Sequence, residues 1–247
     1  MATYKVKFYK GDYSERQAAA NKDKAICYVE QHFNGSSSAS ANYALVVVAS
    51  NAGETSKSWG RQYSQVAARE FGIPDNGVSV GGYLGRGNAN LMYTNMPAIL
   101  LEPFFITNKS GSKWANSESG RQKLAEILVE SIRAQFPLGG LVAFSVGHKY
   151  KKSSPNDRGV QSVDGPMEAD LAEKVLEIAA KLLEGEPVPE PDPTDPEVPT
   201  GEPIATSEWA NDARDWVMKK KISDGTRPQD PVTREELWVM LHRMSKS

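Results

Sequence analysis

Short apolar runs alternate with longer amphipathic segments along residues 1–184. The apolar runs at residues 25–29, 44–49, 98–101 and 141–148 are rich in Val, Ile, Leu and Ala, as is typical of strands buried in a sheet. Residues 5–9 alternate between polar and apolar positions and predict an opening strand. Apolar residues spaced three and four apart predict helices over residues 57–71, 119–136 and 167–183. An N-cap serine followed by good helix formers predicts a short helix at 14–21. The alternation predicts an α/β domain with a mostly parallel sheet flanked by helices.

Residues 77–95 are rich in glycine and show no clear period. Gly82 and Gly85 do not have the spacing of either common phosphate-binding glycine motif, and no lysine follows at a suitable distance. We therefore expect a surface loop in this segment.

The composition changes sharply after residue 184. Residues 185–204 are rich in proline and acidic residues and contain too little apolar surface to fold, which predicts an extended linker. Beyond it, helical patterns over 207–221 and from Thr233 onward predict a small all-α module at 205–247. We thus expect a larger domain at 1–184, a linker and a C-terminal module.

Overall charge and cysteine content restrict the function classes. The formal net charge of −2 provides no electrostatic basis for binding nucleic acid or an anionic membrane. The single cysteine, Cys27, excludes an internal disulfide and is consistent with a reducing compartment. The first residues lack the apolar core of a signal peptide, so we expect synthesis in the cytoplasm and export, if any, by another route.

Three predicted strands end in residues that can perform chemistry, namely His32, Glu102 and His148. The carboxyl ends of parallel strands meet at one edge of a sheet, where α/β proteins build their sites. Glu168 begins a predicted helix and shares the face of its apolar stripe, where a carboxylate is costly unless it meets a cation.

Two imidazoles and one carboxylate form a known open zinc set. Each of these residues could instead be structural, and Glu168 could simply interact with the helix dipole. The third histidine, His242, is predicted to be a surface residue of the C-terminal module.

Three separated motifs add a resemblance to this pattern. Arg16, Ala20 and Asn21, followed by a strand and then His32-Phe-Asn34, resemble the middle motif of the zinc-dependent N-acetylmuramoyl-L-alanine amidases. Residues 97–108 resemble the closing motif of that family, and residues 142–148 followed by Glu168 resemble its opening motif. One departure is Glu30, where the family usually has a small serine.

The opening motif comes last in this chain, which implies a circular permutation. The helix at 119–136 would continue through residues 137–140 into the family's usual first strand. The new termini would fall between the helix at 167–183 and the strand at 5–9. Permutation of this kind is tolerated when the original termini lie close together and the new break is at an exposed loop.

The resemblance implies a function that spacing alone does not. Zn²⁺ would be held by His32, His148 and Glu168, and Glu102 would act as the catalytic proton carrier. The substrate would be peptidoglycan, cleaved at the amide between N-acetylmuramic acid and L-alanine. The alternatives are a zinc peptidase or deacetylase acting on another cell-wall substrate, and a catalytically inactive wall-binding protein.

The C-terminal module resembles a single S-layer homology repeat, which implies binding to a cell-wall polymer. A role only in assembly is the alternative reading of this module. Without a recognisable signal peptide, we expect a lytic enzyme, such as a phage endolysin or an autolysin, that acts on the wall after release. The sequence leaves the oligomeric state open.

Overall fold

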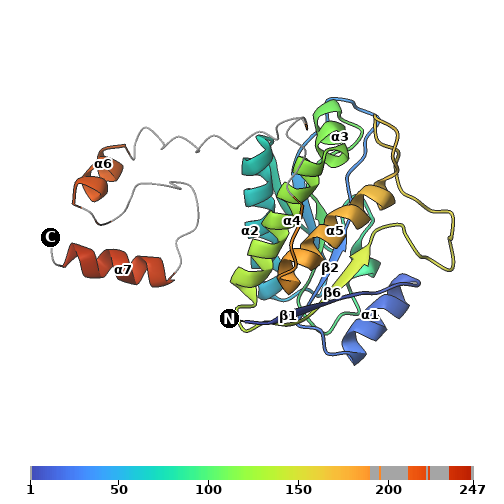
Figure 1. Ribbon diagram of the computed structural model, residues 1–247, viewed down its shortest axis with the longest axis horizontal. Coiled ribbons are helices and arrows are strands. Elements are labelled where there is room, and N and C mark those ends of the chain that lie inside the picture. Colours follow the sequence, from blue (N-terminus) through green and yellow to red (C-terminus); the bar gives the residue numbers. More distant parts are fainter. Residues whose placement is uncertain (1, 190–194, 196–210, 221, 223–233, 246–247) are drawn as a thin grey trace. The chain divides into compact units, whose positions relative to one another are not determined.

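The computed structural model describes residues 2–189, 195, 211–220, 222 and 234–245 (Figure 1). The chain divides into two compact units, Met1–Val198 and Pro199–Ser247. Most of the predicted linker lies outside the described residues, as do the start of the helix predicted from 207 and the beginning of the pattern at Thr233.

A six-stranded sheet forms the centre of the first unit and confirms the predicted mostly parallel α/β fold. Its strand order is β1-β6-β2-β5-β3-β4. All neighbouring strands are parallel except β3 and β5, so β3 and β4 run opposite to the other four strands. The strands are β1 Tyr4–Phe8, β2 Cys27–Gln31, β3 Ala44–Val48, β4 Asp75–Val80, β5 Ala98–Glu102 and β6 Gly140–Val146.

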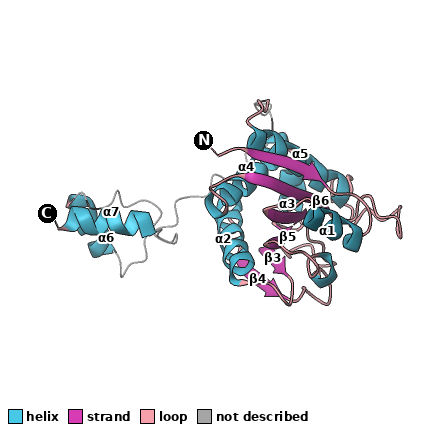
Figure 2. Ribbon diagram, turned by 90° about the horizontal axis from the view of Figure 1, so that it is seen from below, coloured by secondary structure: helices cyan, strands magenta, loops and turns pink. Residues whose placement is uncertain are grey.

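Helices cover both faces of this sheet (Figure 2). They are α1 Tyr13–Lys22, α2 Glu54–Phe71, α3 Lys109–Asn116, α4 Glu118–Gln135 and α5 Glu168–Glu184. The apolar sides of α2, α4 and α5 pack on one face in the larger core, together with Trp114 of α3. A smaller core on the other face contains Ala20 of α1 and Leu91. The sheet is therefore buried on both sides, which explains its continuous apolar runs.

Three elements differ from the sequence expectation. Residues 75–80, part of which was expected to be a surface loop, form the edge strand β4, and Asn88–Asn90 form a 3-10 helix. An edge strand pairs on one side only, and β4 has just Val78 and Val80 as apolar residues, so it lacks a strand pattern. Helix α3 was also missed, because its sequence is rich in Gly, Ser and Lys; its N-cap Asn108 accepts hydrogen bonds from Ser110 N and Gly111 N.

The second unit contains α6 Asn211–Lys219 and α7 Arg234–Met244. Both lie within the helical patterns predicted for this part of the chain. Arg243 Nη1 donates to the carbonyl of Ile222 at 3.2 Å. Across the part of the chain that the structure describes, no helix combines the length and the apolar character that crossing a membrane requires.

Candidate metal centre

The candidate site lies at one edge of the sheet, where β6, β2 and β5 end side by side. His32 directly follows β2, Glu102 is the last residue of β5, and His148 comes two residues after β6. Because these three strands are adjacent and parallel, their carboxyl ends meet at the same edge. Glu168 reaches this edge as the first residue of α5.

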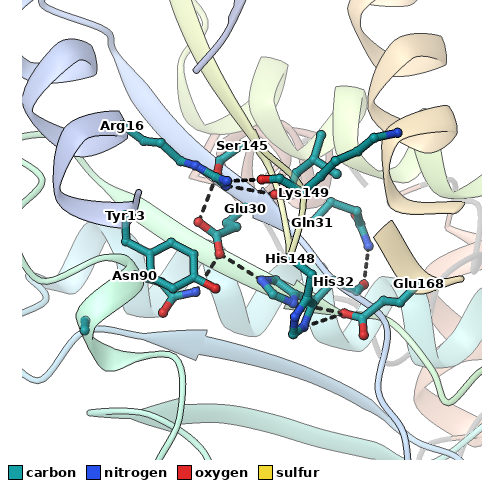
Figure 3. Close-up of polar contacts among 12 residues, drawn as sticks. Tyr13, Arg16, Glu30, Gln31, His32, Asn90, Ser145, His148, Lys149 and Glu168 are labelled. Atoms are coloured by element: carbon teal, nitrogen blue, oxygen red, sulfur yellow. Dashed lines mark hydrogen bonds and ion pairs between the residues drawn. The ribbon is translucent and has the colours of Figure 1, made fainter. Parts of the chain in front are cut away.

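Three of the four predicted site residues converge on one point (Figure 3). Glu168 Oε1 lies 3.0 Å from His32 Nδ1 and 3.4 Å from His148 Nε2. One ligand atom from each of these residues lies within 4.8 Å of the other two, which is an arrangement that could hold a metal ion. His32 and Glu168 are buried, whereas His148 is only half-buried, so the cluster is approached from the side of His148.

The outer nitrogen of each imidazole faces a further carboxylate. His32 Nε2 lies 2.8 Å from Glu30 Oε1, and His148 Nδ1 lies 2.8 Å from Asp157 Oδ1. Metal-binding histidines commonly donate their second ring N–H to a carboxylate in this way, which fixes the tautomer and the ring orientation. The donor set therefore fits a metal ion: two inner nitrogens and a carboxylate oxygen face one another, and the outer nitrogens are already paired.

Glu168 is held in its ionised form. Burial raises the pKa of its carboxyl, but hydrogen bonds from His148 and His32 outweigh this effect and lower the pKa to about 2. The backbone N–H groups of Phe33 and Val160 also donate to its two oxygens, at 3.2 and 3.1 Å. A buried carboxylate fixed this firmly is suited to bind a cation.

Backbone passes close to two of these side chains, at glycines. A Cβ on Gly147 would lie 2.4 Å from Cε1 of His32, and a Cβ on Gly159 would lie 2.2 Å from Oε2 of Glu168. Gly159 also has φ +71°, which favours glycine. Residue 147 must therefore be a glycine, because a side chain at this position would collide with the ring of His32.

Glu102 lies near this cluster but is not part of it. Its Oε2 is buried and has no hydrogen-bond partner among the described residues. Burial raises the pKa of this carboxyl to about 8, with attraction by His32 opposing and repulsion by Glu168 and Glu30 supporting the increase. The site thus contains a carboxyl group with one oxygen, Oε2, that receives no hydrogen bond from the described part of the chain, and with a pKa close to neutrality.

Two carboxylates of the site were not assigned from the sequence. Asp157 lies in the polar loop after β6, nine positions beyond its partner His148, and no local pattern marks it. In the sequence Glu30 stands out only as a departure from the amidase motif, and its spacing of two from His32 is the signal that puts both side chains on one face of the strand.

Comparison with known proteins adds a family match over the first part of the chain. The family model described as N-acetylmuramoyl-L-alanine amidase matches residues 3–134. Among solved structures, an N-acetylmuramoyl-L-alanine amidase from Clostridium difficile 630 is 24% identical, with a TM-score of 0.46, and the match covers 51% of this chain and 66% of that chain.

Two further solved structures are similar to the chain. The catalytic domain of the amidase CwlV from Bacillus (Paenibacillus) polymyxa var. colistinus is 21% identical, with a TM-score of 0.41 and coverage of 51% of this chain and 66% of that chain. The amidase Ami1 from Mycobacterium smegmatis is 26% identical, with a TM-score of 0.40 and coverage of 50% and 59%. In these three comparisons the chain spans at most 66% of the other chain. No curated protein matches the sequence significantly.

Proposed function

The chain belongs to the N-acetylmuramoyl-L-alanine amidase family, and from this we propose that it hydrolyses the amide between N-acetylmuramic acid and the L-alanine of the peptidoglycan stem peptide. The observation that carries the proposal is the convergence of His32, His148 and Glu168 near Glu102 at one edge of the sheet. Metal-assisted hydrolysis needs these two parts, a ligand set and a nearby group that can carry a proton.

In this proposal, His32, His148 and Glu168 hold Zn²⁺, and Glu102 carries the proton. When bound, the ion would polarise the scissile carbonyl and acidify water. Glu102 takes a proton from the attacking water and transfers it to the leaving nitrogen as the C–N bond breaks. The products are a carboxylic acid on the muramic acid side and a free amino group on L-alanine. A pKa raised toward neutrality favours both proton transfers.

Analysis of the digestion products tests the reaction. Purified peptidoglycan is incubated with the wild-type chain, with Glu102→Ala and with Glu130→Ala, a control for an exposed glutamate on α4. New amino termini are then labelled and identified. We expect N-terminal L-alanine from the wild type and the control, and a loss of at least 100-fold in Glu102→Ala, since general acid–base catalysis typically contributes about 10²–10⁴-fold.

The same digest separates the alternatives. Other new amino termini would indicate a peptidase, released acetate would indicate a deacetylase, and new reducing ends would indicate a glycosidase. Wall binding without any of these products would indicate an inactive binding protein. Each of these four results would contradict the amidase proposal.

Metal analysis tests the ligand set independently of activity. We expect about one zinc ion per wild-type chain after dialysis, and none in the variant in which His32, His148 and Glu168 are all replaced by alanine. Full zinc occupancy in that variant would contradict the proposed site.

We also propose that the catalytic domain is circularly permuted. The family match ends at residue 134, so it contains neither His148, which follows β6, nor Glu168, which begins α5. At the other end of the domain, Val6 N donates to Oε1 of Glu184, the last residue of α5, at 2.8 Å. The end of α5 therefore lies beside β1, and a short link could join them in the order that the resemblance implies.

A reordered chain tests the permutation. It would run from 140 to 184 and then, through a short Gly/Ser linker, from 3 to 136. We expect this chain to show the same circular dichroism spectrum as wild-type residues 1–184 and to bind zinc with similar affinity. A reordered chain that folds without binding zinc would contradict the proposal.

The remaining proposals concern the place of action. We propose that the C-terminal unit binds a cell-wall polymer; Trp216 and Trp238 are exposed on α6 and α7, where aromatic rings could pack on sugars. The chain with both tryptophans changed to alanine should cosediment less with purified walls.

We further propose that the enzyme is an endolysin- or autolysin-type protein that acts after release. Cells expressing it should then lyse only when their membrane is permeabilised, and lysis of intact cells would contradict this.

A further inference from the structure

Glu30 is a fully buried carboxylate beside the proposed metal centre, and neither the ligand set nor the proton transfer uses it. It lies on β2, two residues before His32, so the two side chains emerge on the same face of the strand. Its Oε1 lies 2.8 Å from His32 Nε2, the ring nitrogen that points away from Glu168. A buried charge is tolerated only when it is paired and hydrogen-bonded, so its other contacts indicate what it does.

Donors surround both oxygens of Glu30 (Figure 3). Asn90 Nδ2 donates to Oε1 at 2.6 Å, and the hydroxyls of Ser145 and Tyr28 donate to Oε2 at 3.0 and 3.3 Å. Arg16 Nη1 in turn donates to the Ser145 hydroxyl at 2.8 Å. These hydrogen bonds fix the Glu30 carboxylate in place on the side of His32 that faces away from Glu168.

The segment that supplies Asn90 covers this face of the sheet. Asn90 ends the 3-10 helix Asn88–Asn90, whose N-cap is Gly87 with φ 88°. The residue after it, Leu91, is buried in the smaller core, which holds the segment against the sheet. The stretch after β4 thus fixes Glu30 from outside β2, and β6 fixes it from the other side through Ser145.

We propose that Glu30 is a positioning residue for the metal centre: it accepts the Nε2–H of His32 and so directs Nδ1 toward the ion. This role rests on the zinc site proposed above. In His148 the two ring nitrogens have exchanged roles: Nδ1 contacts Asp157, and Nε2 faces Glu168. The two histidines would therefore present different nitrogens, Nδ1 of His32 and Nε2 of His148.

The tautomers of the zinc-loaded full chain provide the first test. The chain has three histidines, so long-range ¹H–¹⁵N correlation spectra resolve each ring. A His242→Gln variant, altered in the second unit, helps to assign them. We expect His32 to carry its proton on Nε2 and His148 to carry its proton on Nδ1. A proton on Nδ1 of His32 would overturn the proposal, and this measurement needs no substitution at Glu30.

Zinc affinity provides the second test. Chelator competition is measured for the wild type, Glu30→Ala, Glu30→Gln and the exposed control Glu130→Ala. We expect zinc binding about 10–100-fold weaker in Glu30→Ala. Glu30→Gln should stay within a few-fold of the wild type, because the amide oxygen can still accept from Nε2 of His32. Circular dichroism shows whether each variant is folded.

The outcomes separate this role from the metal site itself. If folded Glu30→Ala binds zinc as tightly as the wild type, Glu30 is only a structural residue and the proposal is wrong. If Glu30→Gln loses as much affinity as Glu30→Ala, the hydrogen-bond acceptor is not what matters, and the proposal is also wrong. If the wild type binds no zinc, the proposed metal site fails first, and this role fails with it.

Discussion

Replacing Glu102 with glutamine should stabilise the metal-free protein above neutral pH. The carboxyl of Glu102 has a pKa of about 8 in the folded chain, against the ordinary value of 4.5, mainly because of burial. A folded-state pKa above the unfolded value means that the folded chain binds this proton more tightly. The stability from this proton is complete below about pH 4.5 and is lost as the pH rises through about 8.

The size of the effect follows from the two pKa values. Their difference corresponds to ~5 kcal/mol of lost stability once the pH exceeds 8. Relaxation around the carboxylate and entry of water reduce the penalty of a buried charge, so we expect Glu102→Gln to gain ~2–5 kcal/mol at pH 8.5. At pH 5 both side chains are mostly neutral, and the two proteins should differ by less than about 1 kcal/mol.

Urea unfolding with tryptophan fluorescence, in the presence of EDTA, measures this difference at pH 5, 7 and 8.5. Glu130→Gln, an exposed position on α4, is the matched control and should follow the wild type at each pH. A stability difference between the wild type and Glu102→Gln that is the same at pH 5 and 8.5 would refute the reasoning. In that case the Glu102 carboxyl would not be desolvated in the folded protein.

Three further predictions concern the buried thiol of Cys27, the close approach of Gly147 to His32 and the buried side chain of Leu128. Burial raises the pKa of the Cys27 thiol, so a thiol reagent at pH 8 should label the chain only as fast as it unfolds; prompt labelling of native protein would contradict this. Gly147→Ala should weaken zinc binding at least about 10-fold in chelator competition, because the new methyl group collides with the His32 ring. An unchanged zinc affinity would contradict this prediction. Leu128→Ala in α4 should cost about 2–5 kcal/mol in urea unfolding, and a smaller loss would indicate that its cavity collapses.

The central strands of the sheet are predicted by the sequence because they are buried on both faces. Residues 27–31 and 140–146 lie in the middle of the sheet and are largely buried under helices, so both strands are mostly apolar, with Glu30, Gln31 and Ser145 as the exceptions. The edge strand Asp75–Val80 has only one strand neighbour and keeps polar residues, so its pairing with β3 leaves little trace in the pattern. Tertiary packing, rather than local preference, makes it a strand.

The candidate ligands were predictable for a similar reason. His32 and His148 each come just after a strongly apolar strand, and parallel neighbours bring such positions together without knowledge of the register. The apolar stripe of α5 also places Glu168 inward, and the structure shows it between the two imidazoles. The metal that these residues would hold, and the role of Glu102, remain predictions.

The residues that orient the ligands depend on register, and register is not written locally. In the pairing of β2 with β6, Glu30 lies opposite Ser145, so a hydroxyl from a strand 115 positions away reaches its carboxylate. A slip of one residue would turn Ser145 to the other face of the sheet and leave Glu30 with one donor fewer. Asn90 reaches the same carboxylate from a segment without a helical or strand period. Glu30 therefore reads in the sequence as an unexplained charge inside a buried strand, and only the three-dimensional arrangement shows that four side chains donate to it.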